Sequence, residues 1–85
     1  MTMPKPEVML RMLPVDEALI KLDKFLNKAY VDGLYTVRVI HGKGTGTLRL
    51  EVSRELNRHP LVESYRQAAS WEGGMGAMIV QLINK

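Results

Sequence analysis

One short stretch of the 85-residue sequence, VIHGKGTGTLR at residues 39–49, holds the side chains best suited to chemistry. Glycines alternate with other residues after a histidine, and a lysine and an arginine add positive charge; these residues are His41, Gly42, Lys43, Gly44, Gly46 and Arg49. Glycine tolerates backbone conformations closed to other residues, so the N–H groups of such a loop can turn toward a bound oxygen atom. A helix that begins directly after the loop adds the positive end of its dipole. The stretch therefore predicts a site for an anionic group such as phosphate.

His41 is the candidate for proton transfer within this stretch. It falls at the predicted C-terminal end of a strand, which is where open α/β sheets place their ligands. Imidazole exchanges protons near neutral pH, so it can act as a general acid or base. The alternative is a structural histidine whose ring hydrogen-bonds the glycine loop and holds its shape. The residue pattern alone leaves both roles open.

Two familiar phosphate-binding loops do not fit the spacing. A P-loop requires a lysine and then Ser or Thr after its last glycine, whereas Gly46 is followed by Thr47 and Leu48. A dinucleotide-binding fingerprint requires G-x-G-x-x-G, whereas the order here is G-x-G-x-G. An enzyme that uses a mononucleotide or dinucleotide is therefore not expected.

The sequence predicts neither a metal centre nor a cofactor. It contains no cysteine, which removes thiolate ligands and disulfides. Two-metal nucleases need clustered carboxylates. Asp16, Glu17 and Asp23 fall instead on a predicted helix, and no carboxylate flanks the glycine loop.

Positive charge concentrates around the same stretch. Residues 38–66 contain six Lys or Arg and three Glu, which accounts for the whole formal net charge of +3. Arg54 and Arg58 extend the basic character along the next predicted helix. Nucleic acid, DNA or RNA, or another phosphate-bearing partner is therefore favoured. The alternative is a solvated helix face laced with ion pairs.

Three further side chains are weaker candidates. His59 precedes Pro60 and is predicted to bind free carbonyl groups at a helix end. The rings of Tyr65 and Trp71 can stack on bases, but packing in or against the core is the favoured prediction for both.

Hydrophobic periodicity predicts the elements that position the loop. A first helix should contain Pro14 in its first turn, bury one apolar stripe and stop at Gly33. The stripe is Val15, Ala18, Leu19, Leu22, Phe25, Leu26, Ala29 and Tyr30. A second helix is predicted at residues 47–57, with Pro60 ending it. Strands are predicted at residues 7–12, 35–41, 61–68 and 77–83. The last strand is apolar on nearly both faces, which is typical of a central strand.

The predicted order is β-α-β-α-β-β, which makes an α/β two-layer sandwich with a mixed four-stranded sheet and two helices. A chain of this length has room for one core, so we expect one domain at residues 7–85 after a flexible lead at residues 1–6. The lead is not a signal peptide, and no apolar run reaches the length of a membrane span. A cytoplasmic location is the default expectation.

Four segments resemble the Smr (small MutS-related) domain family, in the version at the C-terminus of bacterial MutS2 proteins. VIHGKGTGTLR resembles the family's H-G-x-G-x-G-x-L-R signature, and EGGMGAMIVQL resembles its closing G-G-x-G turn and final strand. VDEALIKLDKFLNKAYVDGL resembles the first helix with its exit, and HPLVESYRQA resembles the segment after the second helix. The resemblance spans Glu7 to Leu82, which is nearly the whole chain.

The resemblance implies a fold similar to the C-terminal domain of translation initiation factor three. It also implies nucleic-acid binding and, as in many members, nicking endonuclease activity on DNA, with roles in DNA repair and recombination. Some members act on RNA, and MutS2 proteins are also tied to stalled ribosomes. The ATPase part of a MutS2-like host protein is a further implied partner. By motif position, the residues implied to form the active or binding loop are His41, Gly42, Lys43, Gly44, Thr45, Gly46 and Arg49.

The opening motif of the family, L-D-L-H-G or L-D-L-R-G, departs most from this sequence. Arg11 fits its His or Arg position, but Met9 stands at the acidic position and Met12 at the glycine. Glu7 shares a strand face with Met9 and Arg11, so it could supply a carboxylate from one step away. The departure bears on catalysis more than on binding.

Two hypotheses follow. In the first, the domain is an endonuclease in which His41 moves a proton while Arg11, Lys43 and Arg49 stabilise charge on the phosphate. In the second, the same loop grips the phosphates of DNA, RNA or the ribosome without cleavage, as a module of a larger protein. A domain that contacts only its own host protein is a third reading, against which the basic segment argues.

Overall fold

A computed structural model describes residues 6–44 and 46–84. Within them the chain forms four strands, two α-helices and two short 3₁₀ helices in the order expected from the sequence. The elements are β1 (Glu7–Met9), α1 (Val15–Val31), β2 (Thr36–Ile40), α2 (Thr47–Arg58), β3 (Val62–Gln67), η1 (Ser70–Glu72), η2 (Gly74–Gly76) and β4 (Ala77–Leu82).

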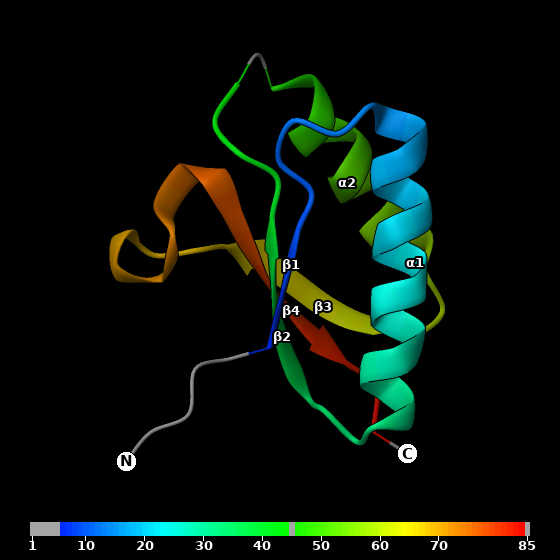
Figure 1. The fold of residues 1–85 in the computed structure, drawn as a ribbon. Helices are drawn as coiled ribbons and strands as arrows, with labels where there is room; N and C mark the ends of the chain where they lie inside the picture. Colours follow the sequence, from blue (N-terminus) through cyan, green and yellow to red (C-terminus); the bar gives the residue numbers. More distant parts are fainter. Residues whose placement is uncertain (1–5, 45, 85) are drawn as a thin grey trace.

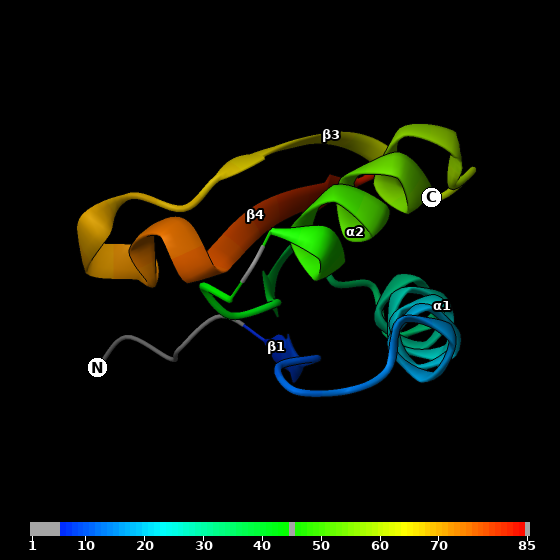
Figure 2. The same ribbon diagram turned by 90° about the horizontal axis from the view of Figure 1, so that it is seen from above.

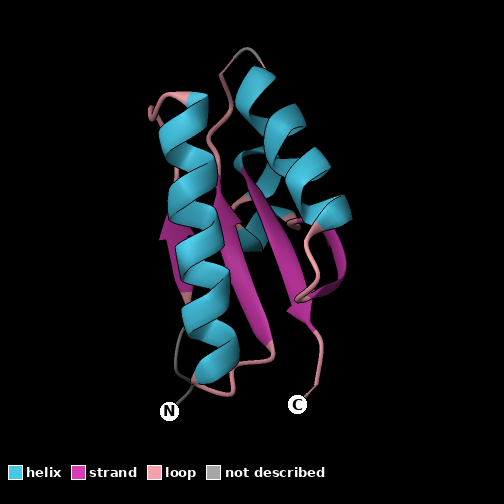
Figure 3. Cartoon of the chain, turned by 90° about the vertical axis from the view of Figure 1, so that its right-hand side faces the viewer, coloured by secondary structure: helices cyan, strands magenta, loops and turns pink. Residues whose placement is uncertain are grey.

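The four strands form one mixed sheet in the order β1-β2-β4-β3 (Figure 1). β1 runs parallel to β2, while β4 is antiparallel to both of its neighbours, β2 and β3. α1 and α2 lie side by side over one face of the sheet (Figure 3), and the segment with η1 and η2 projects on the other side (Figure 1). The predicted two-layer α/β sandwich is therefore confirmed.

The apolar stripe of α1 forms one wall of the core. Ala18, Leu22, Leu26 and Ala29 are its buried residues, and they recur every three or four positions. The helix ends as predicted, because Gly33 adopts a φ of 78° and donates its N–H to the Tyr30 carbonyl at 3.1 Å. α2 contributes Val52 and Leu56 to the same core.

The central position of β4 explains why its sequence is apolar on both faces. Five of its six residues are buried, because alternate residues pack in the main core with the helices and in a smaller cluster on the opposite face, while β2 and β3 flank the strand. This confirms the prediction of a central strand. No helix in the described part of the chain is long and apolar enough to cross a membrane.

The first strand is shorter than predicted. The sequence indicated a strand at residues 7–12, but β1 ends at Met9. Leu10 still donates its N–H to the Ile40 carbonyl at 2.7 Å, and a turn then follows, closed by the Leu13 N–H on the Leu10 carbonyl at 3.1 Å. Met12 occupies this turn with a φ of 68°, a left-handed conformation that is uncommon for a residue other than glycine.

His59 does not bind the carbonyl groups at the end of α2, so that prediction was wrong. Its buried ring instead joins the two helices: Nε2 lies 2.8 Å from the Asp23 Oδ1 on α1, and Nδ1 accepts the Leu61 N–H at 3.2 Å. Because Nδ1 accepts, the proton sits on Nε2 and is donated to the carboxylate. The side chain therefore fixes the register of α1 against the α2–β3 turn.

Tyr65 and Trp71 have different environments. Tyr65 is half-buried against the core, as predicted, and its hydroxyl donates to the Ser53 carbonyl at 3.3 Å. Trp71 is 84% exposed in η1, so the prediction that it packs in or against the core was wrong.

Candidate functional site

The glycine loop is held at the end of β2 by the turn at η2. The backbone N–H groups of His41 and Gly42 both donate to the carbonyl of Gly76, each at 2.9 Å. Gly76 is buried against the loop, with the position of a Cβ on it 3.5 Å from the Gly42 backbone and from Lys43 Cγ. The glycine loop and the G-G-x-G turn, which are far apart in the sequence, are thus joined by hydrogen bonds at this end of the sheet.

Gly42 is required by its conformation and by its neighbour. Its φ of 83° lies in the left-handed region, which other residues rarely adopt. A Cβ on it would lie 3.0 Å from Cγ of Arg11. The bare backbone at Gly42 therefore lets the Arg11 side chain lie directly against the loop.

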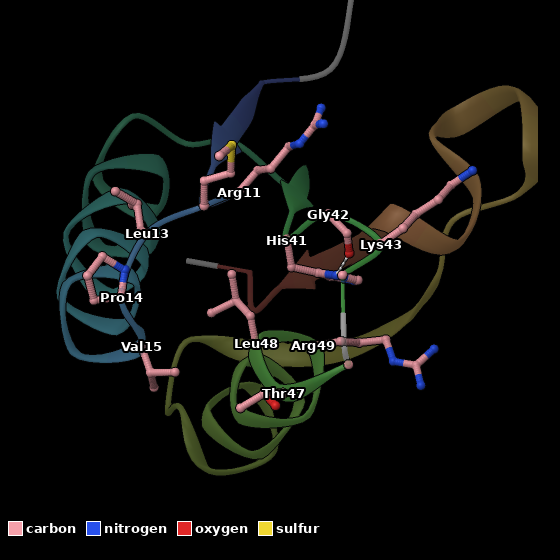
Figure 4. A pocket seen from close by; sticks show the side chains of 13 residues that line it. Arg11, Leu13, Pro14, Val15, His41, Gly42, Lys43, Thr47, Leu48 and Arg49 are labelled. Atoms are coloured by element: carbon pink, nitrogen blue, oxygen red, sulfur yellow. Dashed lines mark hydrogen bonds between the residues drawn. The ribbon is translucent and has the colours of Figure 1, made fainter.

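Three segments enclose a cavity of about 590 Å³ at this end of the sheet. They are the β1–α1 connection, the glycine loop and the first turn of α2, as the close view in Figure 4 shows. The lining residues are Arg11, Met12, Leu13, Pro14, Val15, His41, Gly42, Lys43, Gly44, Gly46, Thr47, Leu48 and Arg49. The cavity combines an apolar wall with a cationic rim, and His41 stands between them (Figure 4).

The His41 ring has a defined tautomer. Its Nδ1 lies 2.7 Å from the Gly42 carbonyl oxygen, and since a carbonyl only accepts, Nδ1 carries the proton. The lone pair of the neutral ring is therefore on Nε2. That atom is buried and has no hydrogen-bond partner among the described residues.

The surroundings favour the neutral ring. Burial lowers the pKa of His41 below its usual value, the hydrogen bond to Gly42 acts in the opposite direction, and the positive charge of Arg49 adds to the lowering. A neutral imidazole can accept a proton at Nε2, so the geometry is compatible with both roles considered for His41: Nδ1 bonds the loop, and Nε2 has no partner among the described residues.

Three cations around the cavity have no carboxylate partner within residues 6–44 and 46–84: Arg11, Lys43 and Arg49. They come from three different segments and all line the cavity. By contrast, Arg54 and Arg58 do not line it, and they pair with Glu51 and Glu55 on α2 at 3.1 and 2.8 Å. The structure thus brings together the described residues of the predicted loop and Arg11, and leaves these two arginines outside.

The first turn of α2 faces the cavity with its positive end. The helix begins at Thr47 after Gly46, whose φ is 92°, and its first turn contains no acidic residue. A helix start of this kind attracts anions through its dipole. Thr45, which the sequence placed in the same loop, lies outside the described residues.

No carboxylate is among the described residues that line the cavity. Met9, at the position where the resemblance implies an acid, is half-exposed on β1. Glu7 pairs with Arg38, its direct partner on β2, and does not reach the cavity wall. Nowhere in the described ranges do three or more His, Cys, Asp or Glu side chains come together as metal ligands would.

The sequence did not single out two features of the site. One is the carbonyl of Gly76, which anchors the loop; the G-G-x-G segment signalled it only as a turn. The other is the apolar wall formed by Leu13, Val15 and Leu48, of which Val15 had been assigned a place in the core stripe of the first helix. Both depend on tertiary contacts between segments far apart in the chain.

Comparisons with known proteins agree with this architecture. The sequence model of the Smr domain family matches residues 9–83. Endonuclease MutS2 of Thermomicrobium roseum is 51% identical over 78 residues, which are 92% of this chain and 10% of that protein. This chain therefore spans about one tenth of the length of the curated relative.

Solved structures give the same result. The crystal structure of the Smr domain of Thermus thermophilus MutS2 matches with a TM-score of 0.89 at 46% identity, covering 92% of this chain and 98% of that one. YdaL, a stand-alone small MutS-related protein from Escherichia coli, matches with a TM-score of 0.82 at 35% identity, covering 89% of this chain and 63% of that one.

Proposed function

The chain belongs to the Smr domain family, and we propose that it binds nucleic acid at the His41 cavity and nicks a phosphodiester bond there. The observation that carries the proposal is the environment of His41. Its free Nε2 stands in a cavity whose rim holds three cations without carboxylate partners among the described residues. A backbone phosphate of DNA fits this combination of charge and proton acceptor.

The cations would act first by binding. Arg11, Lys43 and Arg49 line the cavity from three different segments and direct their charged ends outward at its rim, so a phosphate bound at this rim lies close to positive charge (Figure 4). The same charges stabilise the additional negative charge that develops on the phosphate oxygens as the bond breaks. The positive end of α2 acts in the same direction.

The reaction would use His41 as a general base. A water molecule transfers its proton to Nε2, its oxygen attacks phosphorus, and the bond from phosphorus to the leaving sugar oxygen breaks. The imidazolium formed in this way can then return the proton to that oxygen. Nε2 has almost no exposed surface in this structure, so substrate binding must open a path for water.

Nicking of supercoiled plasmid tests catalysis. We expect the wild-type domain to convert plasmid to the open circle and His41→Ala to lose this activity while retaining its fold by circular dichroism. Arg58→Gln is the matched control, because Arg58 is paired with Glu55 and lies outside the cavity. Equal nicking by metal-depleted wild type and His41→Ala would show that the activity comes from elsewhere.

A second candidate is a non-catalytic binding module of a larger MutS2-like protein. The observation that favours it is the lack of a carboxylate among the described residues lining the cavity, together with Met9 at the family's acidic position. The ligand would then be DNA, RNA or the ribosome, and the ATPase part of the host protein would be a neighbouring partner.

The salt dependence of binding tests what both candidates share. Three phosphate contacts predict a slope of about −2 to −3 for log K against log salt on duplex DNA. Lys43→Gln and Arg49→Gln should each reduce its magnitude by about 0.9, and Arg54→Gln should leave it unchanged. Salt-independent binding, or none, would overturn both candidates; binding without strand cleavage would select the second.

A further inference from the structure

Trp71 is the most exposed aromatic side chain in the described part of the protein. It is 84% exposed, and it is the single tryptophan of the sequence. Water contact over most of an indole is unfavourable, and a large exposed aromatic ring commonly marks a binding surface. Packing within the described part of the domain therefore gives no reason for a tryptophan at this position.

The loop that displays Trp71 is firmly held. Glu72 pairs with Arg66 at 2.9 Å and accepts the Ala69 N–H at 3.0 Å, and the Gly74 N–H donates to the Ala69 carbonyl at 2.9 Å. The Glu72 carbonyl also accepts from Arg38 Nη1 on β2 at 3.1 Å. Trp71 is thus presented from a fixed turn, so ordering it on a ligand costs little entropy.

A second cavity lies between this loop and the glycine loop. Its volume is about 530 Å³, and its lining residues include Arg11, Arg38, Lys43 and Gly73. None of the described residues that line it is acidic. Gly73 is two positions from Trp71, and in the view from above the η1–η2 segment lies close to the glycine loop (Figure 2).

The two cavities adjoin one another. Arg11, Gly42 and Lys43 line both, so the His41 cavity and the second cavity share one ridge. A third hollow of about 340 Å³ also uses Gly42 and Lys43 and reaches Met75, which is exposed on η2. A cationic surface therefore continues from His41 across Lys43 toward the loop of Trp71.

We propose that Trp71 stacks on an unpaired base of the strand whose phosphate occupies the His41 cavity, so that the domain prefers nucleic acid with a single-stranded segment. The inference rests on the proposed function. Arg38 is paired with Glu7, so the positive charge of the second cavity comes from Arg11 and Lys43. A sugar–phosphate backbone fits such a groove, and proteins commonly hold single strands with a basic groove and aromatic rings near it. In an intact duplex both faces of each base are already stacked, which leaves no face for the indole.

Trp71 itself reports on this contact, because it is the sole tryptophan. Titration with a short oligodeoxythymidylate should quench its fluorescence as the ring stacks on thymine. A blunt duplex should bind through the same cations and leave the fluorescence unchanged. Fluorescence anisotropy of labelled DNA gives the two affinities independently of the indole.

Substitutions separate stacking from charge. Trp71→Ala should weaken single-strand binding roughly 5- to 100-fold, the range for loss of one stacked base, and change duplex binding less than about twofold. Trp71→Phe should recover most of the loss. The salt slope should be unaltered in both, because the indole is uncharged. Tyr35→Ala is the matched control, since Tyr35 is also an exposed aromatic but stands at the opposite end of β2.

The outcomes are distinguishable. If the wild type binds neither single strand nor duplex, the proposed function fails and this inference fails with it. If the wild type binds DNA but Trp71→Ala binds single strands as well as the wild type does, only the inference is overturned. Equal weakening of single strand and duplex would also overturn it.

Discussion

Replacement of Gly42 by alanine tests the central piece of geometry at the site, the close approach of Arg11 to the bare loop. The φ of 83° at this residue costs a side chain about 1–2 kcal/mol. The new Cβ would also lie 3.0 Å from Arg11 Cγ, and moving that side chain off its preferred rotamer costs about 0.5–1.5 kcal/mol. Alanine also lowers the conformational entropy of the unfolded chain, which offsets about 0.4–1 kcal/mol of this destabilisation. The net expectation is a destabilisation of about 0.5–3 kcal/mol.

Two other glycines provide matched controls. Gly33 has a φ of 78° and no atom within 4 Å of a Cβ, so Gly33→Ala should show the strain without the Arg11 contact. Gly44 has neither feature, so Gly44→Ala should leave stability unchanged or raise it by up to about 1 kcal/mol. The expected order of stability is Gly44→Ala, then Gly33→Ala, then Gly42→Ala.

Urea unfolding followed by far-ultraviolet circular dichroism measures these differences. Tryptophan fluorescence is a poor choice, because Trp71 is already exposed in the folded state. In thermal unfolding of a domain this size, each kcal/mol corresponds to roughly 4–8 °C. Gly42→Ala should also weaken DNA binding beyond Gly33→Ala, because it displaces Arg11. Equal stability of Gly42→Ala and Gly33→Ala would refute the described approach of Arg11 to the loop.

Three further predictions follow from the structure. Because the pKa of His41 is lowered in the folded state, the unfolded state binds more protons below about pH 6.5, and the free energy of unfolding decreases as the pH falls. Wild type should therefore lose more stability than His41→Gln between about pH 7.5 and 5.5. Equal losses in urea unfolding would contradict a buried neutral ring. Met12→Gly should stabilise the fold by up to about 1 kcal/mol in the same assay, because Met12 has a φ of 68° and is 89% exposed; a destabilised variant would argue against the left-handed turn. His59→Ala removes the contacts to Asp23 and Leu61 and should cost about 1–3 kcal/mol in thermal unfolding, whereas a loss below about 0.5 kcal/mol would show that the ring does not join the two helices.

The fold could be predicted from the sequence to the extent that it follows from local pattern. The stripe on α1, the left-handed stop at Gly33 and the two-faced apolar run of β4 each depend on residues close in the chain, and each was confirmed. The end of β1 could not be predicted in this way. Its turn places a left-handed residue at Met12, where the usual glycine signal is missing.

The site was predictable in its parts and not in its assembly. The glycine loop and His41 stand out in the sequence, but the direction of the His41 ring depends on the Gly42 carbonyl, and the loop depends on Gly76. The exposure of Trp71 was not predicted because aromatic residues are most often buried, and the neighbouring sequence does not show whether this residue packs against the core.

The distribution of ion pairs decides where an anion can bind, and a count of charges along the chain does not. Of the six cations between residues 38 and 66, four have carboxylate partners: Arg38, Arg54, Arg58 and Arg66. A pair of this kind offers little field to a ligand, since its charge is already compensated. Within the described part of the chain Lys43 and Arg49 have no such partner, and the fold adds Arg11 from outside the basic segment. The unpaired positive charge is therefore concentrated around the cavity that His41 lines, and this concentration is what supports the proposal that a phosphate binds there.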